Sequence, residues 1–253
     1  MRRAPRVPNR ADHGPGVGYG SAVDAVPSPG ARARGTLPGF ANSADLGGLA
    51  LPDGRHVPFR RVVRADTPGS LTDDARAAAQ AFGFEAVVDL RSADERQACP
   101  HPLAQLPGYR SLPLIDPAAE ARVDISRYRT LGGIYSSSLQ RNASHIAAIF
   151  EALAGAPPGP VLVCCRAGRD RTGMVIALLL DLAGVDREVI AADYAVRPGL
   201  PAVAETDPDG PDSDAIRQML THVTAEYGST SGYLRWLGLD VSAIAALQQR
   251  LEP

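Results

Sequence analysis

Cys165 and Arg171 lie six positions apart, and a threonine and a glycine follow the arginine directly. A short apolar run at 159–163 precedes the cysteine and predicts a buried strand. Another apolar run, at 174–182, predicts a buried helix. A glycine-bearing loop between a strand and a helix turns several backbone N–H groups toward one point, beside the positive end of the helix dipole. The sequence therefore predicts an anion-binding loop, residues 165–171, with a sulfur atom at its floor.

The side chains of this loop predict covalent catalysis on a phosphate ester. A thiolate beside backbone N–H groups, a helix N-terminus and guanidinium groups has a pKa of about 3.5–7.5. A phosphate monoester would bind the same N–H groups, with Arg171 gripping two of its oxygens. Cys165 would then displace the alcohol from phosphorus, and Thr172 would stabilise the sulfur when the thiophosphate is hydrolysed. The residues expected to bind substrate are Arg166, Ala167, Gly168, Arg169, Asp170 and Arg171.

The rest of the chain alternates between strand and helix patterns. Strands are predicted near 57–63 and at 85–90, 109–115 and 161–164, and helices at 71–82, 135–153, 187–194, 213–227 and 241–251. Such alternation predicts an α/β fold with a largely parallel central sheet flanked by helices on both faces. Ligand sites in such folds lie at the carboxyl ends of the strands, where the anion-binding loop also falls. Asp89 and Arg91, at one strand end, are expected to form a structural pair.

Composition predicts one folded domain at 39–253 behind a disordered, mildly basic tail at 1–38. Neither a signal peptide nor a membrane span is found, so cytoplasm is the expected location, with export by another route left open. The net charge of −2 argues against bulk nucleic-acid binding. Three cysteines are too few for a disulfide framework, and the five histidines lack metal-ligand spacing, so no metal or other cofactor is expected. The oligomeric state is left open.

The segment around Cys165 resembles the signature of the cysteine-dependent protein tyrosine phosphatases, with five residues between the cysteine and Arg-Thr-Gly. The form Ala-Gly-Arg-Asp-Arg-Thr-Gly is similar to a bacterial branch, related to a secreted mycobacterial enzyme, that has lysine as the third residue. Segments 42–48, 87–95 and 227–238 also resemble the family in order, so the likeness covers about residues 40 to 250. It implies the protein tyrosine phosphatase fold and metal-independent hydrolysis of phosphotyrosine, with phosphoserine, phosphothreonine or phosphoinositides as further substrates.

The sequence departs from the family at two places. Cys164 stands where the family usually has a histidine that helps set the pKa of the nucleophile. This leaves open a second function, a catalytically weak phosphate-ester binding module (a pseudophosphatase). Cys164 is interpreted as a small buried thiol, although it or Cys99 could form a disulfide with an oxidised nucleophile. The block with Asn42 and Asp45 lacks the family's aromatic residue and arginine, and is expected to pin the N-terminal segment rather than contact substrate.

A general acid must protonate the departing alcohol, and three aspartates are candidates. Asp116 is preferred because it follows the strand predicted at 109–115 and resembles an aspartate that relatives carry at the matching point. Asp170, inside the anion-binding loop, is the alternative, and its structural role would be to pair with a neighbouring arginine. Asp124 is a weaker candidate. A positioned acid contributes about 10²–10⁴-fold in rate, so mutation can separate these residues.

Arg166 and Arg169 bear on the expected substrate class. Basic residues at these places resemble those of phosphoinositide phosphatases, and they also suit a phosphotyrosine flanked by acidic residues. Alternatively, Arg169 only orders the loop together with Asp170. The stretch 197–212 is rich in Pro, Gly and Asp, so it predicts a short loop and an open cleft rather than the helical lid of some relatives. The expected partner is a phosphotyrosine protein or a phosphoinositide, with no nucleic acid and no integral membrane contact.

Overall fold

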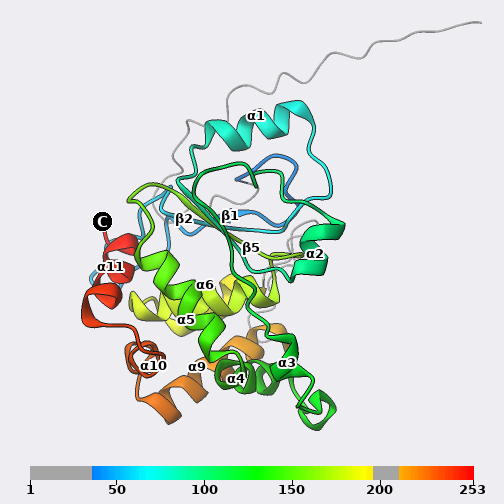
Figure 1. Ribbon diagram of the computed structural model, residues 1–253. Helices are drawn as coiled ribbons and strands as arrows, with labels where there is room; N and C mark the ends of the chain where they lie inside the picture. The colour runs from blue at the N-terminus through cyan, green and yellow to red at the C-terminus, as the bar shows by residue number, and fades with distance from the viewer. Residues whose placement is uncertain (1–35, 196–210) are drawn as a thin grey trace, which may run out of the picture.

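The computed structural model of the protein describes residues 36–195 and 211–253. Most of the predicted tail, and nearly all of the loop predicted at 197–212, lie outside the described residues. Leu37, which the sequence assigns to the tail, is buried in the smaller of two hydrophobic cores. The described elements form a central sheet with helices on both faces (Figure 1).

Five strands form the sheet in the order β1-β2-β5-β3-β4. Their bounds are β1 Ala44–Asp45, β2 Val62–Ala65, β3 Ala86–Asp89, β4 Tyr109–Ser111 and β5 Val161–Cys164. Neighbouring strands are parallel except β1 and β2, which are antiparallel. β5 lies at the centre and is buried on both faces, which makes it a continuous apolar run in the sequence. The predicted α/β class with a largely parallel sheet is confirmed.

Helices cover both faces of this sheet. Their bounds are α1 Asp73–Ala81, α2 Ala93–Ala98, α3 Pro117–Glu120, α4 Leu131–Arg141, α5 Ala143–Ala154, α6 Asp170–Leu182, α7 Arg187–Ala195, α9 Pro211–Tyr227, α10 Thr230–Trp236 and α11 Val241–Leu251, with a 3-10 turn η1 at Ile125–Arg127. Figure 1 shows α1 on one face and α5 and α6 on the other. Helix α9 packs against α4 and α7, which extends the second face away from the sheet.

The strands divide their side chains between two hydrophobic cores, because successive strand residues point to opposite faces. The smaller core gathers strand residues Val63, Ala65, Val87, Leu162 and Cys164 with Phe82 and Ala79 beneath α1. The larger core gathers Val62, Val88, Val161 and Val163 with the apolar sides of α5 and α6. Helix α6 is buried along nearly its whole length because it lies between the sheet and the C-terminal helices.

Several predicted boundaries shift. The helix predicted at 135–153 is two helices, α4 and α5, separated at Asn142. This asparagine is fully buried and its side-chain amide donates to Ser138, so a local side-chain bond competes with a continuous helix. Helix α6 begins at Asp170, ahead of the apolar run from which it was predicted. Strand β2 starts five residues later than the predicted strand near 57–63. Short elements such as β1, α2 and α10 are added to the predicted set.

None of the helices within residues 36–195 and 211–253 is long and apolar enough to span a membrane.

Candidate active site

The anion-binding loop joins β5 to α6 at the carboxyl end of the central strand. Cys165 is the first residue past the strand, and its side chain is buried at this junction. Arg169, the N-cap residue of α6, does not cap the first turn of the helix with its side chain. The hydroxyl of Thr172, in the same turn, is buried without a hydrogen-bond partner in the described part of the chain. The N-terminus of α6 and this hydroxyl belong to the same strand–helix junction as the Cys165 thiol.

Residues outside the loop hold its carbonyl groups. Four hydrogen bonds reach successive carbonyl oxygens: Thr67 Oγ1 to Cys165 (3.1 Å), Thr67 N to Arg166 (3.2 Å), Asn42 Nδ2 to Ala167 (2.9 Å) and Arg64 Nη2 to Gly168 (2.9 Å). In a trans peptide the N–H group points away from the carbonyl group that it adjoins. The N–H groups of residues 166–169 therefore face the inside of the loop, where they can bind an anion.

Of the three residues that hold the loop (Asn42, Arg64 and Thr67), only Asn42 was identified from the sequence, and a different role was predicted for it. Asn42 was expected to pin the N-terminal segment, yet its side chain also reaches the loop. Asp45 does pin that segment, since it accepts hydrogen bonds from the amides of Gly47 and Arg60 at 2.8 Å each. Arg64 is buried in β2 and also forms an ion pair with Asp193 at 2.9 Å. In the sequence, the one signal that could have identified Arg64 is its place within an otherwise apolar strand.

Two glycines allow this close packing. Gly168 has φ +65°, and a Cβ there would lie 2.5 Å from the backbone of Ala65 and Asp66. The loop can therefore approach β2 only with glycine at this position. Gly173, in the first turn of α6, is packed against the ring of Tyr194, where a Cβ would lie 2.5 Å from ring atoms.

The guanidinium group of Arg171 is bound by Glu95. Its two terminal nitrogens donate to the two carboxylate oxygens at 2.5 and 2.7 Å. Glu95 also accepts from the amide of Ser92 at 2.9 Å, in a capping box that opens α2. Hydrogen bonding from Arg171 lowers the pKa of Glu95 to about 2, and the same contact raises the pKa of Arg171. The sequence predicted that Arg171 would grip phosphate; the structure adds a carboxylate that keeps its charge beside the loop.

Asp170 is held by two tyrosines from other helices. The hydroxyl of Tyr135, on α4, donates to Asp170 Oδ1, and the hydroxyl of Tyr194, on α7, lies 3.3 Å from the same oxygen. The two hydroxyls also lie 2.6 Å from each other. Burial first of all raises the pKa of both tyrosines, so both stay protonated as donors. Arg169, the expected partner, lies 4.0 Å from Oδ1.

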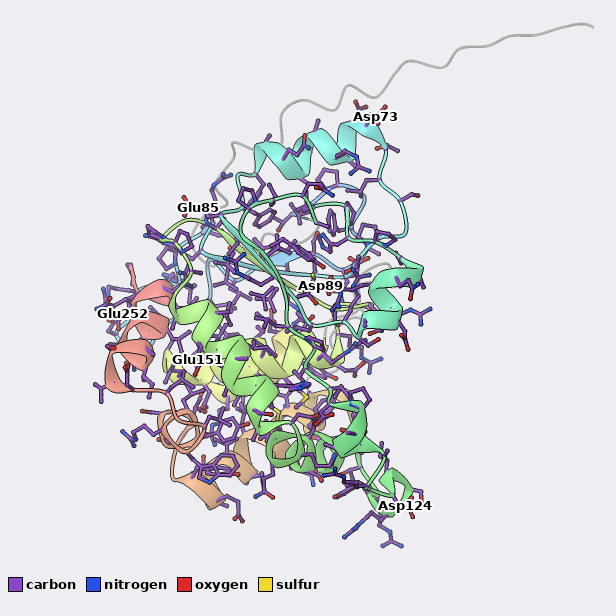
Figure 2. All side chains as sticks on the ribbon, viewed as in Figure 1. Asp73, Glu85, Asp89, Asp124, Glu151 and Glu252 are labelled. Atoms are coloured by element: carbon purple, nitrogen blue, oxygen red, sulfur yellow. The ribbon has the colours of Figure 1, made fainter. Side chains whose placement is uncertain are left out.

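Asp116 and Asp124 have local structural roles. Asp116 caps α3, where Oδ1 accepts from the amide of Ala118 at 2.8 Å, and its own amide donates to Asn142 at 2.7 Å. Asp124 caps η1 by accepting from Ser126. Figure 2 shows Asp124 at the outer end of this segment, far from the sheet. A cavity of about 380 Å³ beside the loop is lined by Asp170 and Arg171, and neither Asp116 nor Asp124 lines it.

The adjacent cysteines face different surroundings. Cys164 is fully buried in the smaller core, with its sulfur 3.8 Å from the carbonyl of Val88, and Cys165 belongs to the larger core. Burial, and next the charge of Asp89, raise the pKa of the Cys164 thiol well above its ordinary value. Cys164 is thus the small buried thiol that the sequence suggested. Cys99 is half-buried at the end of α2 and has a free thiol.

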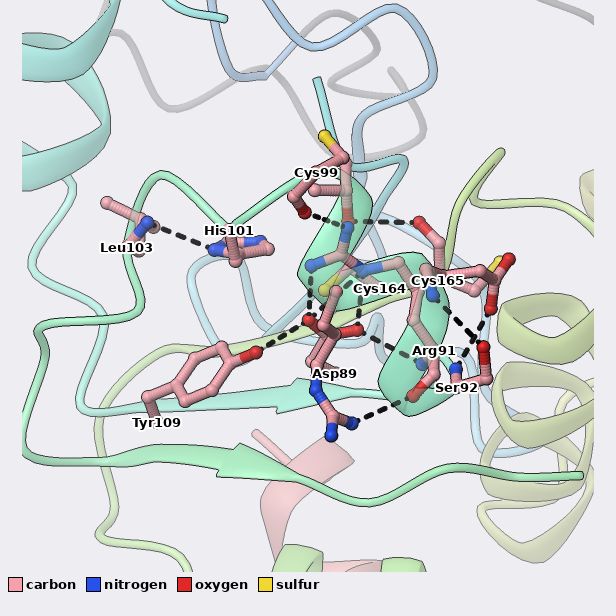
Figure 3. A network of polar contacts seen from close by, with 12 residues as sticks. Asp89, Arg91, Ser92, Cys99, His101, Leu103, Tyr109, Cys164 and Cys165 are labelled. Carbon is pink, nitrogen blue, oxygen red and sulfur yellow. Dashed lines mark hydrogen bonds and ion pairs between the residues drawn. The ribbon is translucent and has the colours of Figure 1, made fainter. Parts of the chain in front are cut away.

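Asp89 and Arg91 form the buried structural pair that was expected. Three nitrogen–oxygen contacts of 2.7 to 3.1 Å join the guanidinium group to the carboxylate, and the Tyr109 hydroxyl adds a fourth at 2.7 Å (Figure 3). Burial alone would raise the pKa of Asp89, but the hydrogen bonds from Arg91 and Tyr109 keep it below its ordinary value. Figure 2 shows Asp89 inside the molecule, whereas labelled acids such as Glu252 and Asp73 lie at its periphery.

Comparison with known proteins agrees with this geometry. Residues 36–252 match the model of the tyrosine phosphatase family. The chain is 28% identical to a tyrosine-protein phosphatase of Nostoc commune over 93% of its own length and 94% of that protein. A stretch of 35 residues, 14% of the chain and 13% of the relative, is 63% identical to the triple specificity protein phosphatase PtpB of Mycobacterium tuberculosis.

Fold and site together define an enzyme that acts on phosphate esters. The chain belongs to the tyrosine phosphatase family, as its sequence suggested, since the family model covers nearly all of the described residues. It is a protein-tyrosine phosphatase, a hydrolase whose substrates are phosphoproteins.

Proposed function

We propose that the enzyme hydrolyses phosphotyrosine through a cysteinyl-phosphate intermediate formed on Cys165. The observation that carries this proposal is the set of four successive carbonyl groups held from outside the anion-binding loop. It directs the N–H groups of residues 166–169 toward one space, next to the thiol. Such a set of donors suits the nonbridging oxygens of a phosphate monoester, and it also stabilises a thiolate.

The first chemical step transfers the phosphoryl group to sulfur. The Cys165 thiolate attacks phosphorus, so that an S–P bond forms while the bond from phosphorus to the tyrosine oxygen breaks. The loop N–H groups and Arg171 stabilise the charge on the transferring group. Because Glu95 anchors the guanidinium group, Arg171 is already in position when the substrate binds. The departing oxygen takes a proton from a general acid.

Three observations support Asp170 rather than Asp116 as this acid. Asp170 lies in the anion-binding loop itself and lines the adjacent cavity. Its Oδ1 accepts from two tyrosine hydroxyls, which leaves Oδ2 to carry the proton. Asp116 instead uses its carboxylate to cap α3. The preference derived from the sequence is therefore reversed in this proposal.

The second step regenerates the enzyme. A water molecule attacks phosphorus, the S–P bond breaks, and Asp170, now a carboxylate, takes the proton of the water. Inorganic phosphate leaves, and the thiolate of Cys165 is restored. The Thr172 hydroxyl, buried without a partner among the described residues, is available to donate to the departing sulfur. At the end of the cycle Asp170 is protonated and Cys165 is a thiolate, as they were at its start.

The test of the nucleophile is hydrolysis of p-nitrophenyl phosphate, in EDTA and reductant, by wild type, Cys165→Ser and Cys164→Ser. We expect Cys165→Ser to abolish turnover and Cys164→Ser, the matched control one residue away, to keep most of it. A wild-type protein that binds vanadate but is inert from pH 5 to 8 would overturn the proposal in favour of the binding-module interpretation.

The test of the acid uses phenyl phosphate, whose leaving group needs a proton. We expect Asp170→Asn to lower kcat by about 10²–10⁴-fold. Asp116→Asn is the matched control and should lower kcat little. The opposite ranking would restore Asp116 as the acid and leave the role of Cys165 intact.

A further inference from the structure

The cavity of about 380 Å³ beside the anion-binding loop has two unlike sides. Asp170 and Arg171 form the side that belongs to the loop. The apolar part of the lining is contributed by Ile115, Ile125, Ile134, Tyr135 and Met174. An apolar surface that adjoins an anion site is suited to a ligand with a charged end and an apolar end. The cavity is referred to below as the apolar cavity.

The outer wall of the apolar cavity is held in place by polar contacts. This wall is the segment 117–128, which contains α3 and η1. Glu120, in α3, accepts from Arg141 of α4 at 2.9 and 3.2 Å, and from Asn142 at 3.2 Å. The Tyr128 hydroxyl lies 2.5 Å from the Ser137 hydroxyl, also on α4. Contacts at both ends therefore fix the wall against α4 and keep the cavity formed.

Ile125 is the exposed part of this wall. It is 40% exposed, one of three large hydrophobic residues that stand out in this way in the described ranges. The other two, Trp236 and Val241, lie on α10 and α11 and do not line the cavity. A single exposed isoleucine is ordinary on a protein surface, so exposure alone does not distinguish Ile125; its place in the lining of the apolar cavity does.

The charges around the cavity disfavour a second phosphate group there. Of the two arginines that line it, Arg141 is engaged by Glu120 and Arg171 by Glu95. Glu120 and Asp170 bring no positive charge to this lining, because Glu120 is paired with Arg141 and Asp170 is the proposed protonated acid. A polyphosphorylated head group would thus meet paired charges and isoleucines on this side of the loop.

The position of the acid decides which way the substrate extends. A general acid must lie within hydrogen-bond distance of the leaving oxygen. Because Asp170 lines the apolar cavity, the leaving group must leave the loop on that side. The other cavity near the loop, of about 590 Å³, is lined by Arg166, Asp94 and Glu95 and does not contain Asp170.

We propose that the apolar cavity binds the organic part of the substrate, and that the enzyme selects aryl phosphates extended by an apolar group, such as a phosphotyrosine with an apolar neighbour. This inference rests on the proposed function, with Asp170 as the acid. Ile125 is the residue that sets the selectivity, because it forms the accessible apolar edge of the cavity. Phosphoinositide head groups are poor substrates by the same argument.

The experiment compares kcat/KM for phenyl phosphate and 4-biphenylyl phosphate, whose leaving groups have similar acidity but differ by one apolar ring. For the wild type we expect a preference of about tenfold for the larger ester. Ile125→Asp should lower kcat/KM for the biphenylyl ester much more than for phenyl phosphate and so remove this preference, and Ile125→Ala should reduce the preference. Val241→Asp is the matched control, because Val241 is 76% exposed on α11, which Figure 1 shows on the other side of the molecule from α3.

The two proposals fail in different ways. If the wild type hydrolyses neither ester, the proposed function is wrong. If it hydrolyses phenyl phosphate but shows no preference for the biphenylyl ester, or if Ile125→Asp keeps that preference, only the inference about the cavity is overturned. A kcat/KM for inositol 1,4,5-trisphosphate above that for the biphenylyl ester would overturn it as well.

Discussion

Two arginine–carboxylate pairs lie near the carboxyl ends of neighbouring strands, and they differ in almost every property. Asp89 and Arg91 are two residues apart, and their side chains are 0% and 1% exposed. Glu95 and Arg171 are 76 residues apart, and each side chain is 22% exposed. Tyr109 and the carbonyl of Cys99 complete the hydrogen bonding of the first pair, and of its two side chains only Arg91 borders a cavity, the one of about 590 Å³. In the second pair both side chains border a cavity: Glu95 the same one, and Arg171 the apolar cavity.

This comparison separates a structural pair from the pair for which we propose a catalytic role. A closed pair gains its strength from complete hydrogen bonding in a dry interior, so an incoming anion has no access to it. An open pair keeps its arginine charged and oriented while leaving other N–H groups of the guanidinium available to a ligand. The sequence shows Asp89 and Arg91 as neighbours, but it gives no sign that Arg171 pairs with Glu95. Exposure and hydrogen-bond count tell the two pairs apart.

The largest expected effect on stability comes from breaking the closed pair. Asp89→Asn removes the charge that compensates the buried guanidinium group of Arg91, and we expect it to lower the free energy of unfolding by about 3–5 kcal/mol. Chemical denaturation at pH 7 measures this. Asp53→Asn, in the exposed pair of Asp53 with Arg55, is the control and should change little. Equal effects of the two substitutions would contradict the distinction between closed and open pairs.

A smaller effect, set by pH, is expected from His101 next to the closed pair. Burial, and beyond that the charge of Arg91, lower its pKa from 6.5 to about 4 against the opposing influence of Asp89. Below pH 6.5 the unfolded chain therefore binds a proton that the folded chain does not, and stability falls as the pH drops from 6.5 to 4. The full loss is about 3 kcal/mol.

Denaturation midpoints between pH 7 and 4 test this dependence. In His101→Asn the amide oxygen can replace Nδ1, which accepts from the amide of Leu103 at 3.0 Å, without a titrating group. The variant should show a flatter pH profile across this window. A wild-type profile in His101→Asn would exclude His101 as the source.

Breaking the open pair of Glu95 and Arg171 should have the smallest effect on stability. Its effect on activity should be larger than that of breaking the closed pair. Glu95→Gln should cost about 1–2 kcal/mol at pH 7, less than the shifted pKa of Glu95 would give by itself, because the pair is partly exposed and solvent screens it. It should nevertheless lower kcat/KM more than Asp89→Asn does in protein that is still folded, since Arg171 loses its anchor. A stability loss as large as that of Asp89→Asn would show that the second pair is structural too.

The pKa of Glu95 gives the same pair a pH signature. Because the pKa lies at about 2 in the folded protein and 4.5 is the ordinary value, this stabilising contribution is complete above pH 4.5 and is lost as the pH falls toward 2. Subtracting the Glu95→Gln profile from that of the wild type should reveal a step in this window.

Much of the fold could be predicted because its signals are local. The run at 161–164 is a buried parallel strand and therefore continuously apolar, and the glycine-bearing segment after it has few alternatives to a strand–loop–helix turn. The anion-binding loop and its cysteine followed from that turn. The predicted helix boundaries were wrong where a single side chain decided them. At Asn142, hydrogen bonds to Ser138 and to the amide of Asp116 separate α4 from α5.

The sequence by itself determined the chemistry of the loop: a thiol, an arginine and a hydroxyl around a ring of backbone donors. Only the tertiary structure decided what holds that ring. Asn42, Arg64 and Thr67 reach the loop across 98 to 125 residues of chain. Glu95 reaches Arg171 across 76 residues, and Tyr135 reaches Asp170 across 35. Such partners leave no periodic trace in the sequence, because they are brought together by the packing of the sheet and helices rather than by the backbone geometry of any one element.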